Sequence, residues 1–313
     1  MTQKNKIAFV FPGQGSQSVG MLSTLADDYP VIVETFSESS EVLGFDLWKL
    51  AKNGPETELN KTEITQPALL TAGVAMWRIW NESGGSRPEV MAGHSLGEYT
   101  ALVCSEVISF PDAVALVAAR GKVMQEAVPA GVGAMAAILG LDDNLVRECC
   151  DKAREGQIVS IANYNSPGQI VIAGHAQAVE RASLYAKQAG AKRVMLLPVS
   201  VPSHCELMED AARQFGQQLE YVTFSDAKIP VIQNVDTEIR FNADEIKRAL
   251  IKQLHQSVRW VETILKIKNM HVTDIIESGP GKVLTGLIKR IDKQITSLSL
   301  TDKETIETAL ATY

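Results

Sequence analysis

A serine between two glycines is the residue of this chain best suited to act as a nucleophile. The segment Gly93–Gly97 has the pattern Gly-x-Ser-x-Gly around Ser95, after the apolar run Val90–Ala92 and before a helix-forming run that begins at Glu98. A strand, a sharp turn and a helix are the setting of a nucleophile elbow, in which small residues let the backbone bend tightly. Free amides at the helix N-terminus can then hold an oxyanion. A glycine-rich turn with a serine N-cap is the alternative.

A serine nucleophile needs a base, and five histidines are available. His204 comes at the start of a predicted helix, where the helix dipole would keep its ring neutral and able to accept a proton. A surface histidine in a capping turn is the alternative, and His255 is the second candidate base. No Asp or Glu is clearly placed to orient the base, so a backbone carbonyl could do so.

Two further side chains could contact a substrate. Arg120 lies on the apolar face of the helix predicted over Pro111–Ala127. A guanidinium there needs an anionic partner, which is either an internal Asp or Glu or the carboxylate of a substrate. Gln14 lies between two glycines after the first strand, where its amide could approach a ligand; a plain glycine turn is the alternative. The third glycine of a dinucleotide fingerprint is missing, so NAD binding is not predicted.

The composition is that of an ordinary globular protein, with 313 residues, 45% of them apolar and 21% charged. The net charge of −7 argues against nucleic acid as a partner. No apolar run reaches the length of a membrane span, and Met1–Lys6 leads directly into a strand without the features of a signal peptide. The four cysteines have no metal-ligand spacing. We therefore expect a cytoplasmic protein without a metal.

Predicted strands and helices alternate in the first part of the chain. The apolar strand Ile7–Phe11 is followed by helices near 30–43 and 66–83, and then by the strand and helix around Ser95. Such alternation predicts a parallel sheet covered by helices, with the ligand site beyond the carboxyl ends of the strands. Gln14 and Ser95 both follow strands directly, so we expect both to face one crevice.

Residues 131–198 are predicted to form an inserted subdomain. Their pattern gives the order strand, helix, strand, strand, helix, strand, with a turn at 165–168, which is the split ferredoxin-like motif. We therefore assign 1–130 plus 199–313 to a large α/β domain and 131–198 to the insertion.

The last part of the chain is predicted to return to the large domain. We expect a helix from Ser203 to about Glu220, one long helical region over 243–269, and a strand over 273–277. A final strand over 295–300 is expected to close the fold.

Six motifs in this order resemble the malonyl-CoA:acyl carrier protein transacylases, the loading enzymes of bacterial fatty acid synthesis, over essentially the whole chain. One local departure is the tripeptide 255–257, His-Gln-Ser, where the family often has Tyr-Asn-Pro. The motifs that carry the resemblance are Phe11–Gln17, Gly93–Tyr99, Arg120-Gly121, Asn163–Pro167, Val199–His204 and Gln253-Leu254 before Trp260.

The resemblance implies a hydrolase-like α/β domain with an inserted ferredoxin-like subdomain, and it implies catalytic roles. Ser95 would be acylated to a malonyl-serine, His204 would be its base, and the backbone carbonyl of Gln253 would orient His204.

The resemblance also implies how the substrate is held. Arg120 would bind the malonyl carboxylate, and Gln14 with the backbone N–H of Leu96 would form the oxyanion hole. The substrates would be malonyl-CoA, a coenzyme A thioester, and the phosphopantetheine thiol of acyl carrier protein, without a tightly bound cofactor. We expect a monomer with no membrane partner.

Two other functions stay open from the residues alone. A serine hydrolase of small esters or thioesters would need the same nucleophile and base but would admit water. A non-enzymatic module that docks the carrier protein would use the inserted subdomain and leave the site inactive. Lys192 and Arg193, at the edge of that subdomain, are expected to receive the anionic carrier protein and coenzyme A, unless they are simply a solvated strand end.

Overall fold

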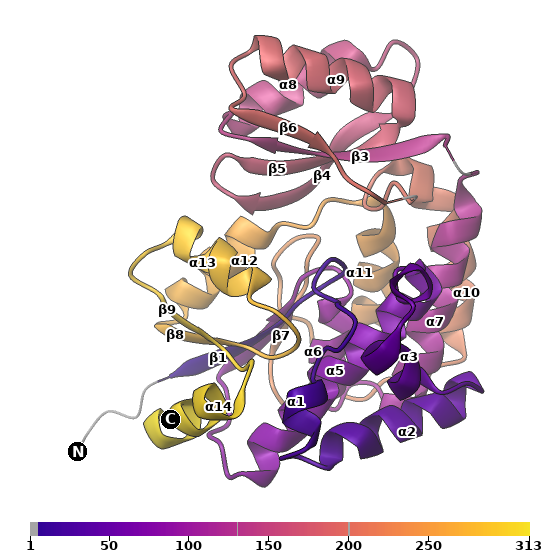
Figure 1. Ribbon diagram of the computed structural model, residues 1–313. Coiled ribbons are helices and arrows are strands. Elements are labelled where there is room, and N and C mark those ends of the chain that lie inside the picture. Colours follow the sequence, from indigo (N-terminus) through magenta and orange to yellow (C-terminus); the bar gives the residue numbers. More distant parts are fainter. Residues whose placement is uncertain (1–5, 130, 200) are drawn as a thin grey trace.

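The computed structural model describes residues 6–129, 131–199 and 201–313, which fold into two units with separate sheets (Figure 1). Three features singled out in the sequence fall partly outside the described residues. These are the start of the chain at Met1–Lys6, the domain boundary at Ala130, and Ser200 in the motif that ends at His204.

The larger unit is built on a five-stranded parallel sheet in the order β7-β2-β1-β8-β9. Phe9 and Phe11 of β1 face one side of this sheet, and Ala8 and Val10 face the other. Since helices cover both sides, β1 and β2 are buried along their whole length and are apolar throughout. The strands are β1 (Ile7–Phe11), β2 (Val90–Gly93), β7 (Val231–Ile232), β8 (Asp274–Glu277) and β9 (Thr296–Ser299).

Helices form a layer on each face of this sheet. Those of the larger unit are α1 (Ser23–Ala26), α2 (Val31–Leu43), α3 (Leu47–Asn53), α4 (Glu56–Leu59), α5 (Thr62–Glu82), α6 (Gly97–Cys104), α7 (Phe110–Ala127), the 3-10 helix η1 (Glu206–Met208), α10 (Glu209–Glu220), α11 (Ala243–His255), α12 (Trp260–Asn269), α13 (Val283–Ile291) and α14 (Lys303–Thr312). Helices α12 and α13 pack on the Val10 face, and the others build the core on the Phe9 face around the buried helix α5.

The smaller unit is a four-stranded antiparallel sheet in the order β4-β5-β3-β6. Its elements follow one another as β3 (Gly133–Leu139), α8 (Asp143–Ala153), β4 (Val159–Ser166), β5 (Gln169–His175), α9 (Ala176–Gln188) and β6 (Arg193–Leu196). Both helices cover one face of the sheet. The other face, with Met135, Ala162 and Val171, packs against Cys205 of the larger unit. The predicted combination of a parallel sheet with a separate antiparallel sheet is confirmed.

The predicted helix from Ser203 begins later than expected. Ser203 and His204 lie in a turn, η1 follows, and the α-helix itself starts only at Glu209. His204 has a positive φ of 63°, and its backbone N–H donates to the carbonyl of Leu254 at 3.0 Å. This long-range bond holds the turn in a conformation that local sequence patterns do not specify.

The single helix predicted over 243–269 is two helices, α11 and α12, separated by residues 256–259. Within this break, Val258 donates its N–H to Ala162 and accepts one from Tyr164, as a parallel bridge to the outer edge of β4. The backbone therefore leaves the helix because its groups pair with another part of the fold.

Smaller differences concern turns and short helices. The turn predicted at 165–168 is only Pro167-Gly168, because Asn165 and Ser166 belong to β4. The chain also continues beyond β9 into α14, whose Asp302 cap was not recognised in the sequence. Among the described residues, no helix has the length and apolar character needed to cross a bilayer.

Candidate active site

The turn between β2 and α6 presents Ser95 in a sharp bend. Ser95 has a positive φ of 52°, the left-handed region that side chains other than glycine rarely adopt. A Cβ at Gly93 would lie 1.8 Å from the carbonyl carbon of Gly97, and one at Gly97 would lie 2.0 Å from the carbonyl oxygen of Phe11. Both glycines are therefore required sterically, which is the physical content of the Gly-x-Ser-x-Gly pattern.

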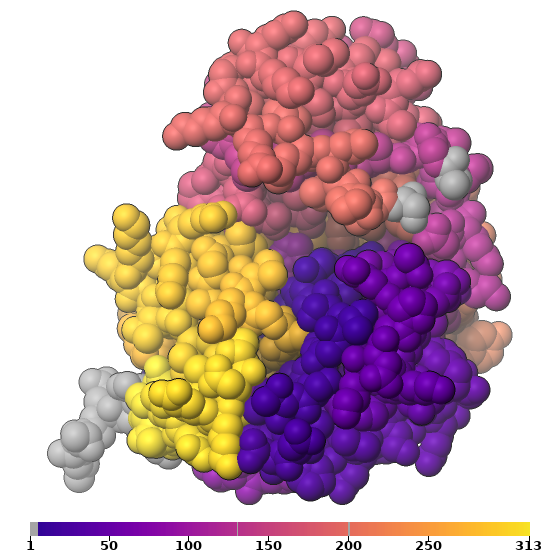
Figure 2. All heavy atoms as spheres, viewed as in Figure 1, coloured from indigo at the N-terminus to yellow at the C-terminus, as the bar shows by residue number. Residues whose placement is uncertain are grey.

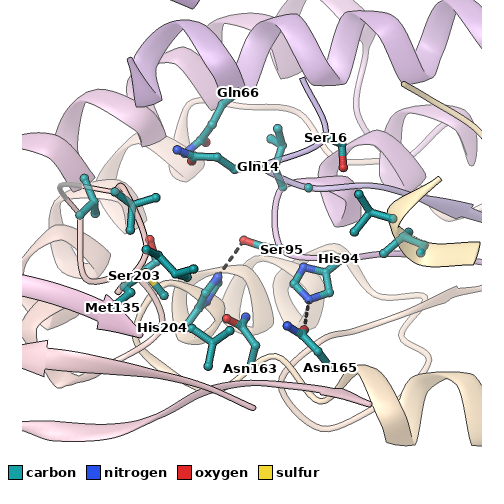
Figure 3. A pocket seen from close by; sticks show the side chains of 18 of the residues that line it. Gln14, Ser16, Gln66, His94, Ser95, Met135, Asn163, Asn165, Ser203 and His204 are labelled. Carbon is teal, nitrogen blue, oxygen red and sulfur yellow. Dashed lines mark hydrogen bonds between the residues drawn. The ribbon is translucent and has the colours of Figure 1, made fainter. Parts of the chain in front are cut away.

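His204 lies beside Ser95, and a backbone carbonyl of α11 fixes the orientation of its ring. Its Nε2 is 2.8 Å from Ser95 Oγ (Figure 3). Its Nδ1 is 2.6 Å from the backbone carbonyl oxygen of Gln253. The carbonyl can only accept, so Nδ1 carries the proton and Nε2 is free to accept one. From the residues alone a backbone carbonyl was one possible orienting group for the base, and the resemblance implied that of Gln253.

The ring of His204 is neutral for a different reason from the one predicted. The turn at 203–204 precedes η1, so His204 is not at a helix N-terminus. Burial, followed by the positive charge of Arg120, lowers the pKa of His204 to about 3. The other candidate base, His255, does not line the cavity at Ser95, and its Nδ1 lies 3.9 Å from Glu209.

Arg120 is buried in the core with only 1% of its surface exposed. Its two terminal nitrogens donate to the side-chain oxygens of Gln66 at 2.8 Å and Gln253 at 3.0 Å, and its guanidinium lies 5.3 Å from the ring centre of Tyr99. The predicted alternative of a direct salt bridge to an internal carboxylate does not occur among the described residues. Each terminal nitrogen keeps one further N–H for an anion.

These groups meet at a cavity of about 230 Å³ between the two units. Figure 2 shows the molecular surface hollowed where the smaller unit, the indigo N-terminal segment and the yellow C-terminal segment meet. Gln14, Ser95, Leu96, Arg120 and His204 all line the cavity. In Figure 3, Gln14 and Gln66 lie on the opposite side of it from Asn163 and Asn165.

The oxyanion-hole candidates come from two adjacent loops. A Cβ at Gly13 would be 2.4 Å from the carbonyl oxygen of His94, so the loop with Gln14 packs directly on the elbow. Leu96 is the N-cap of α6, where the first amides have no acceptor within the helix. Gln253 is fully buried and touches the site through Arg120 and His204 without lining the cavity.

Three side chains at the site were not assigned a role from the sequence. Asn234 accepts a hydrogen bond from the backbone N–H of Ser95 at 2.7 Å and donates one to the carbonyl of Gly93. Gln66 accepts a hydrogen bond from Arg120. Glu98 is fully buried. Two signals were available. Gln66 is a polar residue at the head of an apolar helical run, and Asn234 follows a strand at the carboxyl edge of the sheet, where ligand sites of parallel sheets lie.

In the described part of the chain, no group of three or more His, Cys, Asp or Glu side chains is arranged to hold a metal ion. The four cysteines are all buried and free. Burial raises the pKa of Cys205, the cysteine next to His204, to about 12, so its thiol stays protonated.

A comparison with protein families matches residues 8–307 to the acyl transferase domain. Among curated proteins, the malonyl CoA-acyl carrier protein transacylase of Escherichia coli K12 is 55% identical over 310 residues, which cover 99% of each chain. The protein of the same name from Bacillus subtilis 168 is 47% identical over 309 residues, 98% of this chain and 97% of that protein.

Solved structures give the same result. A malonyl-transacylase in complex with a type II PKS acyl-carrier protein superimposes with a TM-score of 0.98 at 53% identity, covering 99% of this chain and 100% of the other. The malonyl CoA-acyl carrier protein transacylase from Coxiella burnetii has a TM-score of 0.98 at 50% identity, covering 99% of both chains.

Proposed function

Since the chain belongs to the acyl transferase family and its full-length relatives are malonyl-CoA:acyl carrier protein transacylases, we propose that it transfers malonyl from coenzyme A to the carrier protein through a malonyl ester of Ser95. It is an acyltransferase, and malonyl-CoA is its substrate. One observation carries the serine mechanism: Ser95, His204 and the buried Arg120 converge on a single cavity.

In the first half-reaction, Ser95 Oγ attacks the thioester carbonyl of malonyl-CoA while His204 Nε2 takes the hydroxyl proton. The oxyanion of the tetrahedral intermediate is stabilised by the N–H of Leu96 and the side-chain amide of Gln14. The C–S bond then breaks, His204 gives its proton to the departing thiolate, and malonyl remains on Ser95. The carbonyl of Gln253 keeps the ring oriented in both steps.

In the second half-reaction, the phosphopantetheine thiol of the carrier protein gives its proton to His204 and attacks the serine ester. The same oxyanion hole is used, and Ser95 regains its proton as the ester bond breaks. The remaining N–H groups of Arg120 bind the malonyl carboxylate throughout. An acetyl group has no carboxylate and would leave these two buried N–H groups of Arg120 without an acceptor, which is the basis of selection.

Mass spectrometry tests the covalent step. The protein incubated with malonyl-CoA and no thiol acceptor should gain one malonyl group on Ser95, and Ser95→Ala should gain none. Addition of a phosphopantetheine thiol should remove the group and produce the malonyl thioester. Steady release of malonate without an acceptor would favour the hydrolase instead, and an unmodified protein would favour a docking module without activity.

The remaining proposals concern architecture and setting. The order and pairing of the smaller unit support a ferredoxin-like insertion at 131–198 in a hydrolase-like domain of 1–130 plus 199–313. Lys192 and Arg193 at the start of β6 would receive the anionic carrier protein. The enzyme would act as a cytoplasmic monomer without a bound cofactor, metal or nucleic acid.

A further inference from the structure

Glu98 is a fully buried carboxyl group directly beneath the nucleophile. It lies in the first turn of α6 with none of its surface exposed. Its Oε2 accepts the backbone N–H of Asn234 at 2.9 Å and the side-chain amide of Gln253 at 2.9 Å. Its Oε1 has no hydrogen-bond partner among the described residues. Burial of an ionised carboxylate with an unpartnered oxygen destabilises the folded state, so a residue that keeps this arrangement is a candidate for a functional role.

The amide of Gln253 joins Glu98 to Arg120. Gln253 Oε1 accepts from Arg120 at 3.0 Å, and its Nε2 donates to Glu98 Oε2 and also to the carbonyl of Ser95 at 2.9 Å. One side-chain amide therefore connects the guanidinium to the carboxylate through two hydrogen bonds. The backbone carbonyl of the same Gln253 orients His204. Asn234, the other partner of Glu98, holds the N–H of Ser95.

We propose that Glu98 is a positioning residue that balances the charge of Arg120 through the hydrogen-bonded amide of Gln253. When an acyl carboxylate binds Arg120, Glu98 takes up a proton. This inference rests on the proposed function, in which Arg120 binds the malonyl carboxylate. The unpartnered Oε1 is the atom that receives the proton. No proton moves when the acyl group is acetyl, because Arg120 then keeps Glu98 as its counter-charge.

The charges around Glu98 support this exchange. Burial raises the pKa of Glu98 to about 7, against the hydrogen bonds from Gln253 and Asn234 and the attraction of Arg120, while Asp236 after β7 raises it further. His204 and Tyr99, also near the relay, are neutral at this pH. A malonyl carboxylate neutralises Arg120 and removes its attraction for the charge on Glu98. Glu98 is then the carboxylate that is protonated, because the malonyl carboxylate accepts the two remaining N–H groups of Arg120 and so keeps its charge.

The test compares malonyl-CoA with acetyl-CoA. The ratio of their kcat/KM values cancels the titration of His204 and of the coenzyme A phosphate, which both substrates share. In the wild type, we expect this ratio to fall by about tenfold for each pH unit above about 7, because Glu98 is then ionised and must take up a proton when malonyl binds. In Glu98→Gln, an amide oxygen can still accept both hydrogen bonds but no charge remains, so the ratio should stay high and independent of pH.

Three further measurements keep the result decisive. Glu98→Ala, which removes the acceptor of Gln253, should slow both malonyl and acetyl transfer, and Glu89→Gln, at an exposed position before β2, should behave as the wild type. In weakly buffered solution near pH 8, malonylation of wild-type enzyme should take up protons and acetylation should not. This last readout needs no variant and so survives a folding defect in Glu98→Gln.

The outcomes separate the two proposals. A wild type that forms no malonyl-Ser95 would contradict the proposed function itself. A wild type that forms it with a ratio independent of pH, or a Glu98→Gln variant that keeps the wild-type pH dependence, would overturn only the role of Glu98.

Discussion

Arg120 is the residue expected to distinguish acyl groups, because it is buried and its direct hydrogen-bond partners, Gln66 and Gln253, are neutral amides. Arg120→Ala should lower kcat/KM for malonyl-CoA by about 100-fold or more, since loss of a buried charge partner costs about 2–5 kcal/mol. Acetyl transfer should change little. Steady-state kinetics with both thioesters check this.

Arg120→Lys is the matched control for that experiment. It keeps a positive charge but loses the planar fork and cannot bond to both glutamines and a carboxylate in the same way. We expect malonyl transfer between that of the wild type and that of Arg120→Ala. Equal losses of malonyl and acetyl transfer in Arg120→Ala would exclude a direct contact with the malonyl carboxylate.

His204 should make the protein sensitive to acid. Its pKa is lowered to about 3 in the folded state, so the unfolded state binds more protons between that value and the usual value of about 6.5. The free energy of unfolding contributed by His204 is therefore full above about pH 6.5 and is lost as the pH falls. Between pH 7 and pH 5 the loss should be about 2 kcal/mol.

Urea unfolding of the wild type and of His204→Gln at both pH values measures this contribution. The variant should lose about 2 kcal/mol less than the wild type over the same interval. The titration of Glu98, which acts in the opposite direction, is present in both proteins and cancels in the difference. Identical pH dependence in the two proteins would show that His204 is not held neutral by burial.

The sequence indicated those residues whose chemistry stands out locally. Ser95 lies between glycines, and Arg120 interrupts an apolar stripe. His204 was expected as the base, but the reason given, a helix N-terminus, was wrong because its ring is neutral through burial. Glu98 could not be assigned from local patterns, because its partners Asn234 and Gln253 are distant in the chain.

At the scale of elements, the elbow depends on the close approach of α6 to β1. Gly97→Ala would place a Cβ 2.0 Å from the carbonyl oxygen of Phe11, which is backbone and cannot move aside. We expect a loss of several kcal/mol in stability, or failure to fold, because overpacking against the backbone forces the helix away from the sheet. Thermal unfolding measures the effect.

Gly286→Ala is a control for the same substitution in a helix. Gly286 lies inside α13, and a Cβ there meets nothing within 4 Å. The variant should be stabilised by up to about 1 kcal/mol, since alanine favours the helix over glycine. Similar stability of Gly97→Ala and the wild type would contradict the steric account of the elbow.

Element order was predictable where apolar periodicity is strong. Strand Ile7–Phe11 and helix α7 begin and end within one residue of the expected positions. The errors lie at 203–208 and 256–259, where backbone groups of one unit pair with distant segments. Such pairing ends a helix where the sequence has no glycine or proline to indicate the end. Helix α11, for example, ends at the tripeptide His255-Gln256-Ser257.

At the scale of the whole molecule, the two units are joined at the site itself. β4 is an edge strand of the antiparallel sheet, and Val258 covers its outer edge by accepting the N–H of Tyr164 at 3.0 Å. Ser257 donates to the carbonyl of Ile161, and His94 of the elbow bonds to Asn165 at 2.8 Å. The loop that carries Val258 and Ser257 follows α11, whose Gln253 orients His204. We therefore expect docking of the smaller unit and orientation of the base to be coupled.

The combined variant Asn165→Ala and Ser257→Ala tests this coupling, because it removes two side-chain bonds between the units and leaves both cores intact. Each bond contributes about 1 kcal/mol, so amide exchange at Tyr164 and in 256–259 should accelerate about tenfold or more. Exchange in Ile7–Phe11 should not change, and kcat/KM should fall as His204 loses its fixed orientation. Ser40→Ala, which removes a bond within α2 and a bond from the N–H of Leu47 at the start of α3, should change neither quantity. Faster exchange at β4 with unchanged activity would mean that the base keeps its orientation independently of the smaller unit. The two units would then be coupled only through the substrate that binds between them.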